Sequence, residues 1–156
     1  MSDSNPHLWL HLMLLQLLEE NRTDSLTGIL NRRGFEEALL QLNATAQRYQ
    51  HPLTLILIDM CGLKRMNQQQ GHVAGDQALK TLVERIQLNK RDADIIARVG
   101  GDEFALLLPE TSAQQALRAI ERIQSDLHRK HIEISYGIAQ TPSEDLYAEA
   151  DQQLNK

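Results

Sequence analysis

The stretch DIIARVGGDEFALLLP, residues 94–109, contains two apolar segments joined by Gly100, Gly101 and Asp102. Two apolar segments on either side of a Gly-Gly turn are typical of a β-hairpin. Asp102 and Glu103 are adjacent at the bend, directly before the second strand. Two neighbouring carboxylates either face solvent in an acidic turn or bind a ligand, and the hairpin alone leaves both interpretations open.

The segments around this hairpin predict an α+β domain. The continuous apolar segment LTLILID, residues 53–59, is typical of a central strand, and residues 132–140 predict a fourth strand. Apolar residues at spacings of three and four predict helices at about residues 35–49, 63–70, 78–86, 116–127 and 143–156, the last with Ser143 as its cap. This order favours a mainly antiparallel sheet with flanking helices, a ferredoxin-like or polymerase-palm-like fold.

A further helix is predicted at the N-terminus, where Asn5 is the expected cap and Pro6 the first helical residue. Leucines, with Trp9 and Met13, cover nearly its whole circumference. A helix that is apolar all round must be buried or paired, so it packs on its own domain, pairs with a second copy or joins an upstream module. We therefore divide the chain into residues 1–22, a stalk or dimerisation helix, and residues 23–156, one globular domain.

Composition limits the classes of function. The 156 residues are 42% hydrophobic and 24% charged, which is ordinary for one soluble globular domain. The net charge of -5 argues against nonspecific nucleic-acid binding, although a bound metal could still recruit a small anion. Cys61 is the only cysteine, which favours a cytoplasmic location. We expect no signal peptide and no membrane span, because the apolar stretch at residues 8–18 is too short.

Three carboxylates are expected to meet at one edge of the sheet. Asp59 ends a central strand, while Asp102 and Glu103 lie at the bend of the hairpin. Clustered carboxylates bind Mg²⁺, which also binds substrate phosphates. Two metals held by shared carboxylates stabilise the attacking and leaving oxygens of a phosphoryl displacement. The solvated acidic turn is the alternative.

Several motifs lie within residues 23–156. The pentapeptide GGDEF occupies residues 100–104. DSLTGILNRRGF, residues 24–35, resembles the pattern D-x-L-T-G-x-x-N-R-R-x-F, and DMCGLKRMNQQQGHVAGD, residues 59–76, is similar to D-x-D-x-F-K-x-x-N-D-x-x-G-H-x-x-G-D. An R-x-x-D motif begins at Arg91, and the strand ISYGIA occupies residues 134–139. Together these motifs resemble those of the GGDEF family of bacterial diguanylate cyclases, signalling enzymes that join two GTP molecules into cyclic di-GMP and release two pyrophosphates.

The resemblance implies a metal centre with two Mg²⁺ or Mn²⁺ ions per active site. It assigns Asp59, Asp102, Glu103 and the backbone carbonyl of Met60 to the metals. Asp102 is the favoured base for the attacking 3′-hydroxyl, and Lys64 would place a positive charge on the phosphates. Cys61 stands where the family usually has a second acid.

The resemblance also implies how GTP is held. Asn67 and Asp76 match the pair that reads guanine, since an amide and a carboxylate complement the polar edge of that base. His72 would cap or orient the turn between them. Gly100 and Gly101 would let the backbone approach the phosphates closely.

The resemblance also implies a second site, away from Asp59, Asp102 and Glu103. Arg91 and Asp94, with Arg122 on a following helix, match the family's inhibitory site for cyclic di-GMP. Arginine forks suit guanine edges and phosphates. A surface arginine paired with a nearby acid is the alternative.

Together these matches imply a diguanylate cyclase that works as a homodimer, because two GTP-loaded sites must face each other, with a possible upstream sensory module. A catalytically weak or inactive receptor for cyclic di-GMP or GTP is the main alternative, and a palm-type polymerase a more distant one. One departure is ADQQLNK, residues 150–156, where the family continues A-D-x-A-L-Y-x-A-K-x-x-G-R-N. Asn155 takes the tyrosine position. If the protein ends at Lys156, without the following lysine and arginine, we expect weaker binding of the triphosphate; the alternative is that this sequence is a piece of a longer protein.

Overall fold

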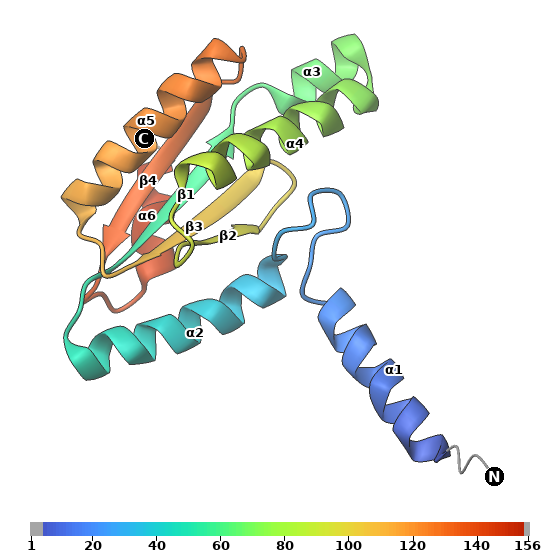
Figure 1. Ribbon diagram of the computed structural model, residues 1–156. Coiled ribbons are helices and arrows are strands. Elements are labelled where there is room, and N and C mark those ends of the chain that lie inside the picture. Colours follow the sequence, from blue (N-terminus) through green and yellow to red (C-terminus); the bar gives the residue numbers. More distant parts are fainter. Residues whose placement is uncertain (1–4, 155–156) are drawn as a thin grey trace.

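The computed structural model describes residues 5–154, in which helices flank the strands of one sheet (Figure 1). The elements follow in the order α1 (Pro6–Glu20), α2 (Arg32–Tyr49), β1 (Leu53–Met60), α3 (Leu63–Gln70), α4 (His72–Asn89), β2 (Ile95–Arg98), β3 (Glu103–Pro109), α5 (Ala113–Arg129), β4 (Ile134–Gln140) and α6 (Leu146–Leu154). The predicted hairpin, central strand and fourth strand are therefore confirmed.

The four strands form a sheet in the order β2-β3-β1-β4, and each neighbouring pair is antiparallel. β1 is central because its residues are apolar on both faces: all but Asp59 are buried. This sheet with its flanking helices confirms the predicted α+β class.

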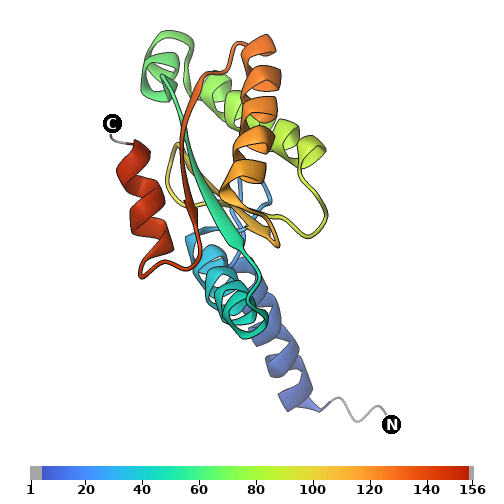
Figure 2. The same ribbon diagram turned by 90° about the vertical axis from the view of Figure 1, so that its left-hand side faces the viewer.

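Residues of β1 and β3 alternate between two hydrophobic layers. Even-numbered residues such as Ile56, Ile58 and Phe104 pack with α4 and α5, while odd-numbered residues such as Leu57 and Ala105 pack with α2 and α6. Figure 2 shows the sheet between α6 on one side and α5 on the other. Because side chains alternate along a strand, the odd-numbered acids near the strand ends belong to the face that α2 and α6 cover.

Side-chain caps explain where several helices begin. Asn31 accepts a hydrogen bond from the Gly34 amide at the start of α2, and Ser112 forms a capping box at the start of α5. The prediction that Ser143 caps the last helix is wrong. Asp145, two residues further along the chain and directly before α6, accepts a hydrogen bond from the Ala148 amide instead.

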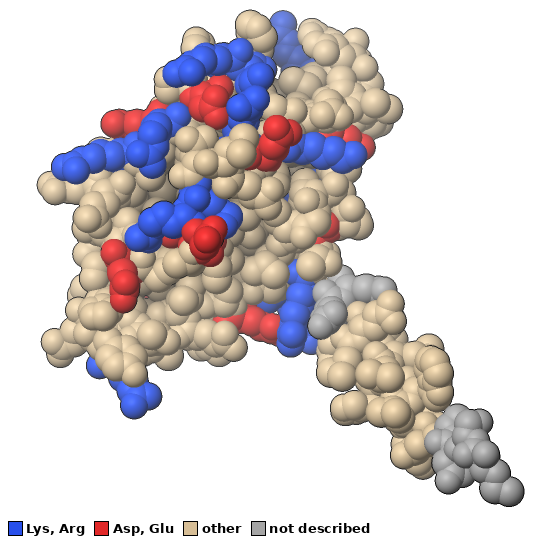
Figure 3. All heavy atoms as spheres, in the orientation of Figure 1, with Lys and Arg blue, Asp and Glu red and all other residues tan. Residues whose placement is uncertain are grey.

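Helix α1 projects away from the sheet and its covering helices (Figure 1). Its leucines, Trp9 and Met13 are between 40% and 65% exposed, so the alternative that it packs on its own domain is wrong. Residues 6–18 contain no Lys, Arg, Asp or Glu, and this surface is tan in Figure 3, whereas both signs of charge are scattered over the rest of the face. Among residues 5–154, no helix is long and apolar enough to cross a membrane.

Candidate functional site

Asp59 and Glu103 lie opposite each other in the antiparallel register of β1 and β3. Both are odd-numbered residues, so both side chains leave the sheet on the face that α2 and α6 cover. Asp102 precedes Glu103 in the turn, where its carbonyl accepts a 2.9 Å hydrogen bond from the Met60 amide. The structure therefore brings Asp59, Met60, Asp102 and Glu103 together at one edge of the sheet.

The environment of Asp59 disfavours its negative charge. Burial, the charge and side-chain hydrogen bond of Asp102, and the charge of Glu103 together raise the pKa of Asp59 from 3.8 to about 6, with burial the largest cause. A divalent cation relieves such a cluster, and carboxylate oxygens are the ligands that Mg²⁺ and Mn²⁺ prefer. The residues present thus fit a divalent metal. Within residues 5–154, however, no three acidic, histidine or cysteine side chains already converge on one metal position.

Glu103 is held by a residue outside the quoted motifs. The Tyr147 hydroxyl, on α6, donates a 2.8 Å hydrogen bond to Glu103 Oε1. Arg32 Nη1 donates to the same hydroxyl over 3.3 Å, and the Arg32 guanidinium lies 4.9 Å from the centre of the Tyr147 ring. The sequence carried no signal for Tyr147, because the contact joins residues 44 apart and depends on where α6 packs.

The Gly-Gly turn is held through Arg98, which links it to Asp24 in the motif at residues 24–35. Arg98 donates from Nε and Nη2 to the Gly101 carbonyl, over 3.1 and 2.7 Å, and pairs with Asp24 through Nη1 at 3.3 Å. Burial raises the pKa of Asp24, but the hydrogen bonds from Thr27 and the charge of Arg98 outweigh it, and the pKa falls below the usual value. Asp24 and Arg98 thus position the turn, a role that the sequence analysis did not assign.

A hollow of about 450 Å³ lies beside the acids. Lys64, Asn67, His72, Gly101 and Asp102 line it, together with two other side chains of α3. His72 is the first residue of α4 and borders the hollow, as expected of a residue that orients the turn between α3 and α4. Of the residues predicted to hold GTP, Gly100 and the exposed Asp76, one turn along α4, do not line this hollow.

Asn67 lies where α3 and α4 come into close contact. A Cβ added at Gly75 would overlap the Asn67 amide, so a larger residue at position 75 would force the Asn67 side chain to move. The Oδ1 atom of Asn67 is buried and has no hydrogen-bond partner among the described residues. An unpaired buried acceptor is costly, and a ligand donor would satisfy it.

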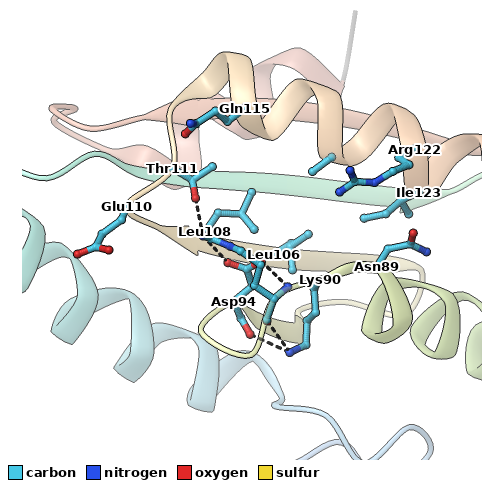
Figure 4. Close-up of a pocket in the computed structure, with 12 residues that line it drawn as sticks. Asn89, Lys90, Asp94, Leu106, Leu108, Glu110, Thr111, Gln115, Arg122 and Ile123 are labelled. Carbon is cyan, nitrogen blue, oxygen red and sulfur yellow. Dashed lines mark hydrogen bonds and ion pairs between the residues drawn. The ribbon is translucent and has the colours of Figure 1, made fainter.

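The residues of the expected inhibitory site border a separate hollow of about 230 Å³. Figure 4 shows Asp94 on one side of it and Arg122, from α5, on the other. Arg91 is held against the protein: Nη2 donates to Asp94 Oδ1, to the Pro109 carbonyl and to Thr111 Oγ1 over 3.0, 2.8 and 2.6 Å.

Comparison with protein families decides between the two families considered for this sequence, the GGDEF family and the palm-type polymerases. Residues 21–156 match the family described as "Diguanylate cyclase, GGDEF domain". The chain belongs to the GGDEF family. The family resemblance read from the motifs is therefore confirmed, and the palm-type polymerase alternative is set aside.

Individual GGDEF proteins show the extent of the likeness. The uncharacterized protein YhcK of Bacillus subtilis is 42% identical over 130 residues, 81% of this chain and 36% of its own length. The diguanylate cyclase DgcP of Pseudomonas aeruginosa is 40% identical over 112 residues, 69% of this chain and 17% of its own. The chain therefore spans about a third or less of these two relatives.

A solved GGDEF structure extends the comparison to α1. The coiled coil and GGDEF domain of DgcB from Caulobacter crescentus, in complex with c-di-GMP, superimposes with a TM-score of 0.88 at 26% identity. The match covers 99% of this chain and 90% of that one. The match therefore extends over α1 as well as the domain, and the matched DgcB structure comprises a coiled coil and a GGDEF domain.

Proposed function

We propose that this GGDEF domain is a diguanylate cyclase that condenses two GTP molecules into cyclic di-GMP. The observation that carries the proposal is the pairing of Asp59 with Glu103 across β1 and β3, with Asp102 in the adjoining turn. Support also comes from relatives whose names include diguanylate cyclase, among them DgcP.

In the proposed reaction, the 3′-oxygen of one GTP attacks the α-phosphorus of the other. A 3′–5′ phosphodiester bond forms, the bond from the α-phosphorus to the bridging oxygen breaks, and pyrophosphate leaves. Asp102, the favoured base, accepts the hydroxyl proton because it borders the hollow beside the acids. The same step in the opposite direction closes the ring and releases the second pyrophosphate.

Asp59, Asp102, Glu103 and the Met60 carbonyl would hold two Mg²⁺ or Mn²⁺ ions. When bound, these ions lower the free energy of the negative charge that develops on the attacking and leaving oxygens. The Arg98 bonds to the Gly101 carbonyl hold the turn so that Asp102 and Glu103 keep their places beside Asp59. The chain's own contribution is therefore positioning of charge before the substrate arrives.

The hollow of about 450 Å³ is the proposed GTP site. Lys64, at the start of α3, would neutralise phosphate charge, and Asn67 would recognise guanine with Asp76 from the neighbouring helix. His72 would orient the turn between them, and Gly100 would leave room for phosphate at the backbone. A cytoplasmic location suits this substrate and the single cysteine.

Two such sites must face each other, so the proposal requires a homodimer. Helix α1 is the proposed pairing element, because its apolar side chains are exposed all round. An upstream sensory module joined to α1 would control how the two domains meet.

Incubation with GTP and Mg²⁺, followed by chromatography, tests the proposal. We expect cyclic di-GMP and two pyrophosphates per product molecule. Glu103→Gln should abolish turnover while the circular dichroism spectrum stays unchanged, because the amide cannot carry the charge that a metal needs. Glu84→Gln, on the exposed face of α4, is the matched control and should keep full activity. Turnover by Glu103→Gln would contradict the metal assignment.

A receptor for cyclic di-GMP is the second candidate. The hollow between Asp94 and Arg122 favours it, since it presents arginines and an acid in the pattern implied for the inhibitory site. Calorimetry with cyclic di-GMP separates the two functions. Tight binding without any product from GTP would favour the receptor, whereas binding together with turnover would assign Arg91, Asp94 and Arg122 to feedback inhibition.

A further inference from the structure

Tyr147 joins the C-terminal helix to the candidate metal site. Its side chain comes from the first turn of α6, on the face of the sheet that carries Asp59 and Glu103. Its hydroxyl donates to Glu103 Oε1 over 2.8 Å. The hydroxyl is thus hydrogen-bonded to one of the two oxygens of a carboxylate that the proposed reaction needs.

The other oxygen of Glu103 is directed elsewhere. Oε2 lies beside Gly100, 3.8 Å from where a Cβ on that glycine would be. With Oε1 held on the α6 side, Oε2 is left on the side of the Gly-Gly turn. A carboxylate with one oxygen hydrogen-bonded and the other free cannot rotate without losing that bond.

The Tyr147 ring is itself held on two sides. The Arg32 guanidinium lies over the ring at 4.9 Å, and the ring of the buried Phe35 is 6.0 Å away at an angle of 56°. Arg32 Nη1 also donates to the hydroxyl oxygen over 3.3 Å, so that oxygen accepts one bond while its hydrogen is given to Glu103.

We propose that Tyr147 is a positioning residue that orients the Glu103 carboxylate for metal binding. The inference rests on the proposed function, since it assumes that Glu103 binds a divalent cation. It goes beyond the proposed function by assigning to α6 and α2 the side chains that hold the Glu103 carboxylate in place. Hydrogen-bond partners of metal ligands fix ligand orientation, and their removal lowers metal affinity by about 10- to 100-fold.

Tyr147→Phe tests the proposal, because it removes the hydroxyl and leaves the ring between Arg32 and Phe35. The readout is the dissociation constant of Mn²⁺, followed by electron paramagnetic resonance in the presence of a GTP analogue with a non-hydrolysable α–β linkage. We expect Mn²⁺ affinity to fall about tenfold or more. The affinity of the analogue alone, measured in EDTA, should not change.

Tyr136→Phe is the matched control, since Tyr136 lies on β4 but packs on the opposite face of the sheet. It should bind Mn²⁺ as the original chain does. Equal or tighter Mn²⁺ binding by Tyr147→Phe would overturn the inference and leave the proposed function intact. A parallel loss of analogue affinity and melting temperature would show a merely structural role and overturn it as well. If the unaltered chain binds no Mn²⁺, the proposed function fails, and the inference fails with it.

Discussion

Asp59 carries a negative charge that the folded chain disfavours. Burial, Asp102 and Glu103 raise its pKa from 3.8 to about 6. A raised pKa means that the folded chain binds this proton more tightly than the unfolded chain does. In metal-free protein, the stability that the proton contributes is therefore present below the unfolded value and is lost as the pH rises through the folded value.

Asp59→Asn should therefore stabilise the metal-free protein at high pH only. We expect its melting temperature in EDTA to match the unaltered chain at about pH 4 and to exceed it by a few degrees at about pH 8, since the amide has no charge to bury. Thermal unfolding followed by circular dichroism measures the difference. Asp92→Asn, an exposed aspartate before β2, is the control and should show no such gain. If Asp59→Asn and the unaltered chain had equal melting temperatures at every pH, the charge of Asp59 would not destabilise the folded protein, and this prediction would be contradicted.

The sequence predicted the meeting of Asp59 with Asp102 and Glu103, because an apolar strand and a hairpin leave few other arrangements for their ends. It did not predict the residues that hold this cluster in place. Arg98 bonds Asp24 across 74 positions, and Tyr147 reaches Glu103 across 44. Such contacts depend on how loops and helices pack, and the local periodicity of the chain carries no information about them.

At the scale of elements, α6 is placed by one glycine of β4. A Cβ at Gly137 would overlap the Ala150 carbonyl and lie 2.9 Å from the Cβ of Gln153. This close approach lets the Gln153 amide donate to the Ile138 carbonyl over 2.6 Å and accept from the Ile138 amide over 2.9 Å. Gln153 thereby pairs backbone groups of β4, an edge strand, and α6 is held where Tyr147 reaches Glu103.

Gly137→Ala should move α6 away from the sheet. We expect the free energy of unfolding to fall by about 1–3 kcal/mol, because a methyl group forced against backbone displaces the helix. Urea denaturation measures this change. Gly101→Ala is the matched control: nothing lies within 4 Å of its added Cβ, so its stability should stay the same or rise slightly. Unchanged stability of Gly137→Ala would show that α6 is held by other contacts.

The element boundaries show which signals in the sequence were reliable. The end of α2 before His51 and the short α3 followed by Gly71 were predicted, because proline and glycine stop helices for local reasons. Tyr49, the last residue of the apolar series predicted for this helix, is 57% exposed, so the spacing did not predict burial at the end of α2. The start of α6 was misplaced because Ser143 and Asp145 are both competent caps, and packing chose between them.

For the whole molecule, α1 is the element whose surface the domain leaves without a partner. Leu10, Leu14 and Leu17 lie at spacings of four and three, so they form one stripe, and each is more than half exposed. Pairing with a second copy would bury this stripe, and the solved DgcB structure with a coiled coil aligns over 99% of this chain. Because the proposed reaction needs two facing sites, pairing and turnover should be lost together.

A chain with Leu10→Glu, Leu14→Glu and Leu17→Glu should therefore be monomeric and inactive, because like charges would meet along the stripe. Sedimentation velocity measures the state of association, and pyrophosphate release measures turnover. The unaltered chain should lose activity per molecule as it is diluted, since a dimer dissociates by mass action. Leu40→Glu, an exposed leucine of α2, is the control and should leave both properties unchanged. A triple variant that is monomeric but fully active would show that α1 does not bring the two sites together.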